Sequence, residues 1–167
     1  MGQETLMSRM TGKPMRERPL LRAFMRFPIY LYRAHLGWIF GERFLMLSHT
    51  GRKSGLERFV VLEVVNQDKE NKIFYVAAAW GEKADWYRNI LENPKVMVQV
   101  KNQRYTAHAE RISPEAALEN LWVYARKYPK AFTQLIKTIL GESLPPDYAS
   151  CKKMATAFPM VALKAVK

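Results

Sequence analysis

The chain has 167 residues, 49% of them hydrophobic, and a single cysteine. This composition suits one globular domain with its own core, and it excludes both an intrinsically disordered protein and a fold held by internal disulfides. The 27 lysines and arginines outnumber the 15 aspartates and glutamates, so the net charge of +12 predicts an acidic partner. Nucleic acid, an anionic lipid surface and a phosphorylated cofactor all meet that description.

Residues 1–40 are basic and are expected to form an amphipathic helical segment. The first 35 residues carry seven lysines and arginines against two glutamates. Pro28 is predicted to divide the segment and to start a second short helix at Ile29. On a helical wheel, four cations fall within about 80° of one another, opposite a broad apolar face. They are Arg18, Arg22, Arg26 and Arg33.

This basic segment has two interpretations. Arginines on one face and large apolar residues on the other are typical of a helix that lies on an anionic membrane surface. The same pattern describes a helix that packs on the domain and keeps its arginines in water. A spanning helix and a cleaved signal peptide are both disfavoured, because charged residues interrupt every apolar run and no cleavage pattern follows.

After the basic segment, apolar and β-branched runs predict six strands and capping signals predict four helices. The strands are expected at 43–49, 59–65, 72–79, 95–101, 103–111 and 158–163. The helices are expected at 85–92, 114–128, 129–140 and 147–154. Several strands follow one another without an intervening helix, which favours antiparallel pairing. We therefore expect an α+β, mainly β, architecture: a basic segment at 1–40, then a small antiparallel barrel at 41–167 with surrounding helices.

The most specific segment is the loop between the first two strands, GRKSGLER at residues 51–58. Two glycines allow a sharp turn and a close approach to a ligand, and three cations suit an anionic group. The lysine precedes the second glycine, so this is not a Walker A loop. A solvated hairpin tip is the alternative interpretation. The residues expected to bind a ligand are Gly51, Arg52, Lys53, Ser54, Gly55 and Arg58.

A second motif begins where the third strand ends. Small residues there would let a flat group approach the backbone, and the following helix carries Trp86 and Asn89 three residues apart on one face. An aromatic ring and an amide can hold a planar ligand by stacking and hydrogen bonding. Alternatively, Trp86 anchors the core and Asn89 caps its helix. The small residues and the aromatic that follows them are Ala77, Ala78, Ala79 and Trp80.

Together, TGRKSGxxR at 50–58, WGEKADWYRNIxxNPxVxVQV at 80–100 and a closing apolar strand resemble the deazaflavin (coenzyme F420)-dependent nitroreductase family. The resemblance runs from about Phe44 to Leu163. It implies a split β-barrel related to flavin-binding oxidoreductases. It also implies binding of coenzyme F420, an 8-hydroxy-5-deazaflavin with a phosphate and a polyglutamate tail, with FMN as the less favoured cofactor. Family members often lie at the inner membrane face, so a cytoplasmic protein with a peripheral N-terminal helix is expected.

Residue by residue, the resemblance implies that Lys53 and Arg58 pair with the phosphate and the tail carboxylates, with Arg52 adding charge beside them. Val61 stands where the family usually has a proline beside the deazaflavin. The positions implied to line the ring or its edge are Val61, Ala77, Ala78, Ala79, Trp80, Trp86 and Asn89.

The implied activity is hydride transfer from reduced coenzyme F420 to an electrophilic small molecule such as a quinone, an enone or a nitro compound. Tyr148 is the expected proton donor or acceptor-lining residue, and Cys151 stands where another tyrosine is expected. A non-catalytic barrel that binds a cofactor or a lipid is the alternative. No metal site is expected from the histidine spacing, and dispersed basic residues argue against a nucleic-acid partner. The oligomeric state stays open.

Overall fold

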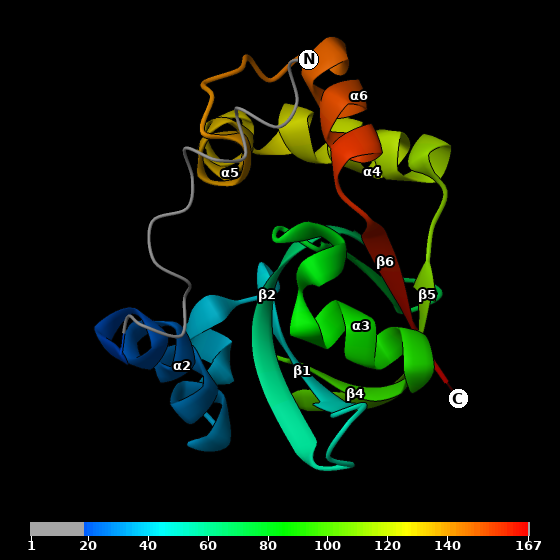
Figure 1. Cartoon of the computed structure of the whole chain (residues 1–167). Coiled ribbons are helices and arrows are strands. Elements are labelled where there is room, and N and C mark those ends of the chain that lie inside the picture. Colours follow the sequence, from blue (N-terminus) through cyan, green and yellow to red (C-terminus); the bar gives the residue numbers. More distant parts are fainter. Residues whose placement is uncertain (1–18, 167) are drawn as a thin grey trace.

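The computed structural model describes residues 19–166, and the predictions for residues 1–18 lie outside them (Figure 1). The helices are α2 (Pro19–Arg33), η2 (Gly37–Phe40), η3 (Gly81–Lys83), α3 (Asp85–Glu92), α4 (Pro114–Lys127), α5 (Pro129–Leu140) and α6 (Tyr148–Ala157). The strands are β1 (Phe44–Thr50), β2 (Glu57–Asp68), β3 (Ile73–Ala77), β4 (Lys95–Val100), β5 (Gln103–Arg111) and β6 (Met160–Ala165).

The six strands form one closed antiparallel barrel, as the sequence predicted. Their order around the barrel is β1-β2-β3-β6-β5-β4, and β4 returns to pair with β1. Three of the six pairings join strands that follow one another across a short loop, whereas β6 comes from the far end of the chain and inserts between β3 and β5. Closure therefore depends on the C-terminal strand, which leaves no unpaired sheet edge.

The barrel interior is one apolar core, and helix α3 covers one open end of it (Figure 1). Alternate residues of the strands point inward, as in Leu45 and Leu47 on β1. From α3, Trp86, Tyr87 and Ile90 join the same cluster. The helix is short, with eight residues, so its position depends on this buried face rather than on intrinsic helix stability.

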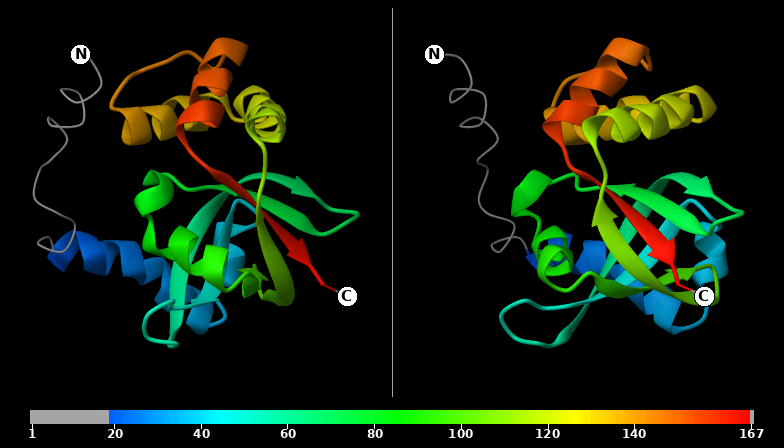
Figure 2. Two further views of the ribbon diagram at one scale, coloured as in Figure 1. Left: turned by 45° about the vertical axis from the view of Figure 1, so that its right-hand side comes forward. Right: turned by 90° about the vertical axis from the view of Figure 1, so that its right-hand side faces the viewer.

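A second core lies between helices α4, α5 and α6 and the outer surface of β2, β3 and β6. Figure 2 shows these three helices as a layer above the barrel in both views. Phe132 and Ile136 of α5 are fully buried there, together with Leu121 of α4 and Met154 of α6. Val65 of β2 faces this layer, so the strand is buried on both sides at that point.

The caps of α4 and α5 lie where the sequence places them. The Ser113 hydroxyl accepts a hydrogen bond from the Ala116 N–H at 3.2 Å, and proline occupies the first position of α4. Gly141 ends α5 in the left-handed conformation with φ +71°.

Strand β2 is longer than predicted. Residues 66–68 look like a polar turn in the sequence, but they pair with β3 after a register shift between Val64 and Asn66. The Asn66 Nδ2 donates to Oδ1 of Asn120 on α4 at 2.9 Å. A partner on the helix layer thus stabilises a polar residue within the strand, which local sequence does not reveal.

Helix α2 runs unbroken through Pro28, so the predicted division at Ile29 is wrong. A proline removes one hydrogen bond to the carbonyl four residues earlier, and here the helix continues despite that loss to Arg33. None of the helices in residues 19–166 is long and apolar enough to cross a bilayer. The division of the chain near residue 40 stays a prediction.

The end of α2 packs directly on the barrel. Tyr32 is fully buried, and its hydroxyl donates to the Phe44 carbonyl oxygen at 2.8 Å. The Arg33 guanidinium lies 4.7 Å from the centre of the Phe59 ring on β2. These contacts fit the interpretation in which the helix rests on the domain, at least at its C-terminal turn.

Candidate functional site

The loop between β1 and β2 is a compact turn that needs both of its glycines. The Gly51 N–H donates to the Leu56 carbonyl at 2.8 Å, and the Gly55 N–H donates to the Gly51 carbonyl at 2.8 Å. Gly55 has φ +66°, a conformation that side chains rarely adopt. A Cβ on Gly51 would lie 2.7 Å from the Ser54 hydroxyl. These bonds give the loop one defined turn, whose residues 53–58 are exposed to solvent.

One cation of the loop, Arg52, is folded onto helix α3. Its backbone N–H and its Nη1 both donate to Asn89 Oδ1, at 3.1 and 2.9 Å. Its Nη2 pairs with the Asp85 carboxylate at 3.1 Å. The structure thus brings the two predicted motifs together, because a loop residue and a helix residue that are 37 positions apart share these bonds.

His49 is a third member of this hydrogen-bonded group, and it contacts the other side of the Asn89 amide. The Asn89 Nδ2 lies 3.1 Å from Nδ1 of His49, the residue next to the last of β1. Burial, with a smaller contribution from the Arg58 charge, lowers the pKa of His49 to about 4. The imidazole is therefore neutral at neutral pH. The sequence alone did not point to His49 or Asp85, because neither has a metal or catalytic spacing. The signals that could have indicated them are their positions, His49 just before the loop and Asp85 at the start of α3.

The other two cations of the loop are directed to solvent. Lys53 and Arg58 are exposed, and neither forms an ion pair within residues 19–166. In the same described part, the backbone N–H groups of Lys53 and Ser54 have no protein acceptor. Two free cations beside two free N–H donors form a suitable donor set for a phosphate or a carboxylate.

The second predicted segment leads from β3 to α3. The Ala78 N–H donates to the Pro159 carbonyl at 2.9 Å, and the Gly81 N–H donates to the Ala78 carbonyl at 2.8 Å. Trp80 is 52% exposed, whereas Trp86 is 7% exposed and belongs to the barrel core. Ala77 and Ala79 are half-buried against the helix layer.

The remaining predicted residues lie on other surfaces. Val61 is half-buried on the outer face of β2, opposite Met46 of β1. Tyr148 begins α6, is 54% exposed, and packs its ring edge-on against Trp122 at 5.8 Å. Among the contacts found within residues 19–166, none joins Tyr148 to the loop or to α3.

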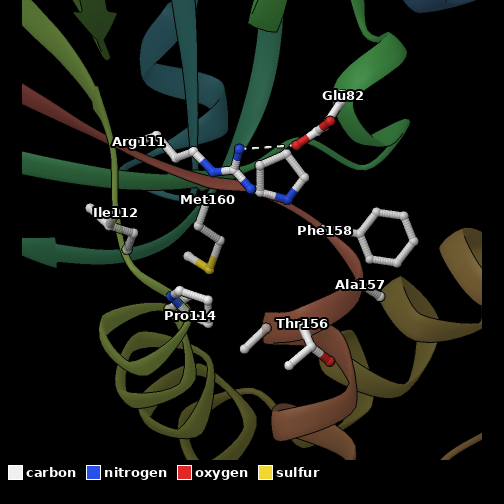
Figure 3. Close-up of a pocket in the computed structure, with 11 residues that line it drawn as sticks. Glu82, Arg111, Ile112, Pro114, Thr156, Ala157, Phe158 and Met160 are labelled. Atoms are coloured by element: carbon white, nitrogen blue, oxygen red, sulfur yellow. Dashed lines mark hydrogen bonds and ion pairs between the residues drawn. The ribbon is translucent and has the colours of Figure 1, made fainter.

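A cavity of about 120 Å³ lies where η3, β5 and the end of α6 meet (Figure 3). Figure 3 shows the Arg111 guanidinium paired with the Glu82 carboxylate, at 2.9 Å, above the side chain of Met160. Pro159, whose carbonyl holds Ala78, also lines the cavity. Sequence reasoning missed this cavity, because its walls come from segments about 75 residues apart in the chain.

The family model described as F420H(2)-dependent quinone reductase matches residues 26–138, well over half of the chain. A search of curated proteins found no match. This chain is similar to a solved F420-H2 dependent reductase, FDR-A, at 20% identity and a TM-score of 0.50, covering 74% of this chain and 96% of that one.

It is also similar to the protein Atu2129 from Agrobacterium tumefaciens str. C58, of unknown function. The identity is 16% and the TM-score 0.52, with 84% of this chain and 55% of that one covered. A third structure, described as a domain-swapped dimer, matches at 20% identity and a TM-score of 0.51, covering 74% of this chain and 81% of that one. At these identities the likeness shows a common fold.

Proposed function

This chain belongs to the F420H(2)-dependent quinone reductase family and is an F420-dependent oxidoreductase, and we propose that its acceptor is a quinone. When bound, reduced coenzyme F420 supplies a hydride, and a quinone that takes up this hydride and one proton becomes a quinol. The protein's part is to hold the cofactor and the acceptor and to let the proton reach the product.

The quinone is proposed from the family description, and the observation that carries the binding of the cofactor is the donor set of the loop. Lys53, Arg58 and the free N–H groups of Lys53 and Ser54 lie on one turn whose shape is already set by its internal hydrogen bonds. We propose that they bind the phosphate and the tail carboxylates of the cofactor. A turn held by its own hydrogen bonds would lose little conformational entropy when the ligand arrives.

For the ring, we propose the outer surface at Val61 and the segment from Ala77 to Trp80. The exposed Trp80 indole offers a stacking surface at the end of that segment, whereas Ala78 is buried and its N–H is bonded to the Pro159 carbonyl. The buried Trp86 would act differently: it holds α3 in the barrel core and so keeps Asn89 beside the loop.

The first experiment is a fluorescence titration with oxidised coenzyme F420 and, separately, with FMN. Each charge-assisted hydrogen bond contributes about 1.5–3 kcal/mol, so removing both cations in Lys53→Ala/Arg58→Ala should weaken F420 binding at least a hundredfold. The matched control is Lys130→Ala/Lys137→Ala, which removes two exposed lysines from α5. Equal affinities in the two double variants would refute the assignment of the loop. A sample that bound fatty acid and neither cofactor would support the non-catalytic alternative.

The acceptor is tested by steady-state oxidation of reduced F420 with menadione, a nitroimidazole and an enone. We expect menadione to give the highest kcat/KM.

We further propose that Tyr148 supplies the proton to the reduced product, because its hydroxyl is on an exposed ring. Unchanged turnover in Tyr148→Phe would remove this role, and solvent would then be the proton source.

Helix α2 supports a further proposal, that the protein binds anionic membrane surfaces peripherally. Phe27 and Tyr30 of α2 and Trp38 of η2 are exposed large side chains, and Arg26 is exposed beside them. Such a mixture suits the interface of an anionic bilayer. Co-sedimentation with phosphatidylglycerol vesicles should fall in Phe27→Ser/Tyr30→Ser, and equal partitioning of native and variant protein would dismiss the proposal.

A further inference from the structure

The three cations of the loop differ in their surroundings. The Arg52 side chain is only 17% exposed, and its guanidinium is shared between the Asn89 amide and the Asp85 carboxylate. Its positive charge is thus already balanced within the protein. Lys53 and Arg58 are exposed, and within residues 19–166 neither is in an ion pair.

The hydrogen bonds also define the orientation of the Asn89 amide. Its Oδ1 accepts two bonds from Arg52, one from the backbone and one from the guanidinium, and both donors are unambiguous. The opposite atom, Nδ2, must therefore face His49, at 3.1 Å from Nδ1. An amide nitrogen only donates, so His49 Nδ1 accepts and the imidazole proton is on Nε2.

We propose that His49, Asn89, Arg52 and Asp85 form an internal brace for the loop, and that Arg52 is a positioning residue that does not contact the cofactor. This rests on the proposed function, in which the loop binds the anionic part of coenzyme F420. The brace runs from the end of β1 through the amide of α3 to the loop backbone at Arg52. The ligand-binding donors, Lys53 and Ser54, are the next two residues.

A chain of this kind works only if each member is paired. Both His49 and Asn89 are 5% exposed, so removing one partner leaves a buried polar group without a hydrogen bond. Loss of the brace should let the loop leave its ordered turn for part of the time. A loop that spent a tenth of its time in the competent form would bind about tenfold more weakly.

The salt dependence of F420 binding separates the two kinds of cation. Pairs between exposed charges are screened by salt, so the weakening of binding with ionic strength reflects the cations that meet the ligand. Lys53→Gln should reduce this salt dependence by about half, because one of two contacts is lost. Arg52→Gln/Asp85→Asn keeps the net charge and removes the guanidinium bonds of the brace; it should bind about tenfold more weakly with the salt dependence of the native protein.

His49 provides a second, uncharged test. His49→Phe removes the acceptor for Asn89 and should weaken binding about tenfold, again with unchanged salt dependence. His49→Gln restores an acceptor oxygen and should recover most of the affinity. A salt dependence that fell in Arg52→Gln/Asp85→Asn as it does in Lys53→Gln would make Arg52 a ligand contact and overturn the proposal. Unchanged affinity in the brace variants would overturn it as well.

The brace is also tested without any cofactor. Long-range ¹⁵N–¹H NMR spectra of the native protein should show His49 as the neutral tautomer protonated on Nε2, and a proton on Nδ1 would overturn the brace. If the native protein bound no F420, the proposed function would fail, and the tautomer would still decide whether the brace exists.

Discussion

Lowering the pH from 7.5 to 4.5 should destabilise the protein through His49. The pKa of this buried imidazole is about 4 in the folded chain, against 6.5 for the ordinary residue. The groups that act on it are Arg58, whose charge lowers the pKa, and Asp85, whose charge raises it, both less than burial does. The unfolded chain therefore takes up a proton as the pH falls through 6.5, whereas the folded chain does so only near pH 4.

The size of the effect follows from this difference in pKa. Above pH 6.5 both states are neutral at His49, so the residue costs nothing. Between pH 6.5 and 4 the free energy of unfolding decreases by up to about 1.4 kcal/mol per pH unit, which approaches about 3 kcal/mol in all. Between pH 7.5 and 4.5 the expected loss from this residue is about 2.5 kcal/mol.

Urea unfolding at pH 7.5, 6.5, 5.5 and 4.5 measures this loss, in the native protein and in His49→Gln. The variant cannot be protonated at this site, so its free energy of unfolding should decrease about 2.5 kcal/mol less over the range. His108→Gln, at an exposed position of β5, controls for the loss of a histidine. Parallel pH profiles for native protein and His49→Gln would refute the reasoning. They would mean that the pKa of His49 is the same in the folded and the unfolded chain.

Three further changes test the packing and the turns by urea unfolding. Phe132→Ala should destabilise the protein by about 4 kcal/mol, because this fully buried ring joins α5 to α4, whereas Val123→Ala on the exposed side of α4 should have little effect. Ser113→Ala removes the N-cap of α4 and should cost about 1 kcal/mol; no change would mean that water replaces the cap. Gly55→Ala should cost about 1 kcal/mol because of the positive φ, and Gly55→Asn much less. Equal losses in the two Gly55 variants would contradict that explanation.

Local signals in the sequence were sufficient for most of the secondary structure. The helix from Asp85 to Glu92 and the strand from Gln103 to Arg111 have the predicted bounds, and Ser113 and Gly141 mark helix ends as expected. These signals involve residues within a few positions of one another. The same holds for the glycine turn at residues 51–58, whereas the binding of a ligand by this turn stays a prediction.

Pro28 shows where a local rule fails. The rule states correctly that a proline costs a hydrogen bond within a helix, but it does not say what else holds the helix. In the structure the turn after Pro28 leads to Tyr32, which is buried on the barrel and bonded to Phe44. Whether a helix continues through a proline is decided by such contacts between distant residues.

By itself, then, the sequence determined the number of strands, the helix caps, the positive loop and the family resemblance. Each of these depends on short motifs, whose residues lie close together in the chain. Only the tertiary structure decided that β6 closes the barrel between β3 and β5, and that Arg52 turns inward while Lys53 and Arg58 stay exposed. The physical reason is that these outcomes depend on pairs such as His49 and Asn89, which are 40 residues apart and meet only when the chain has folded.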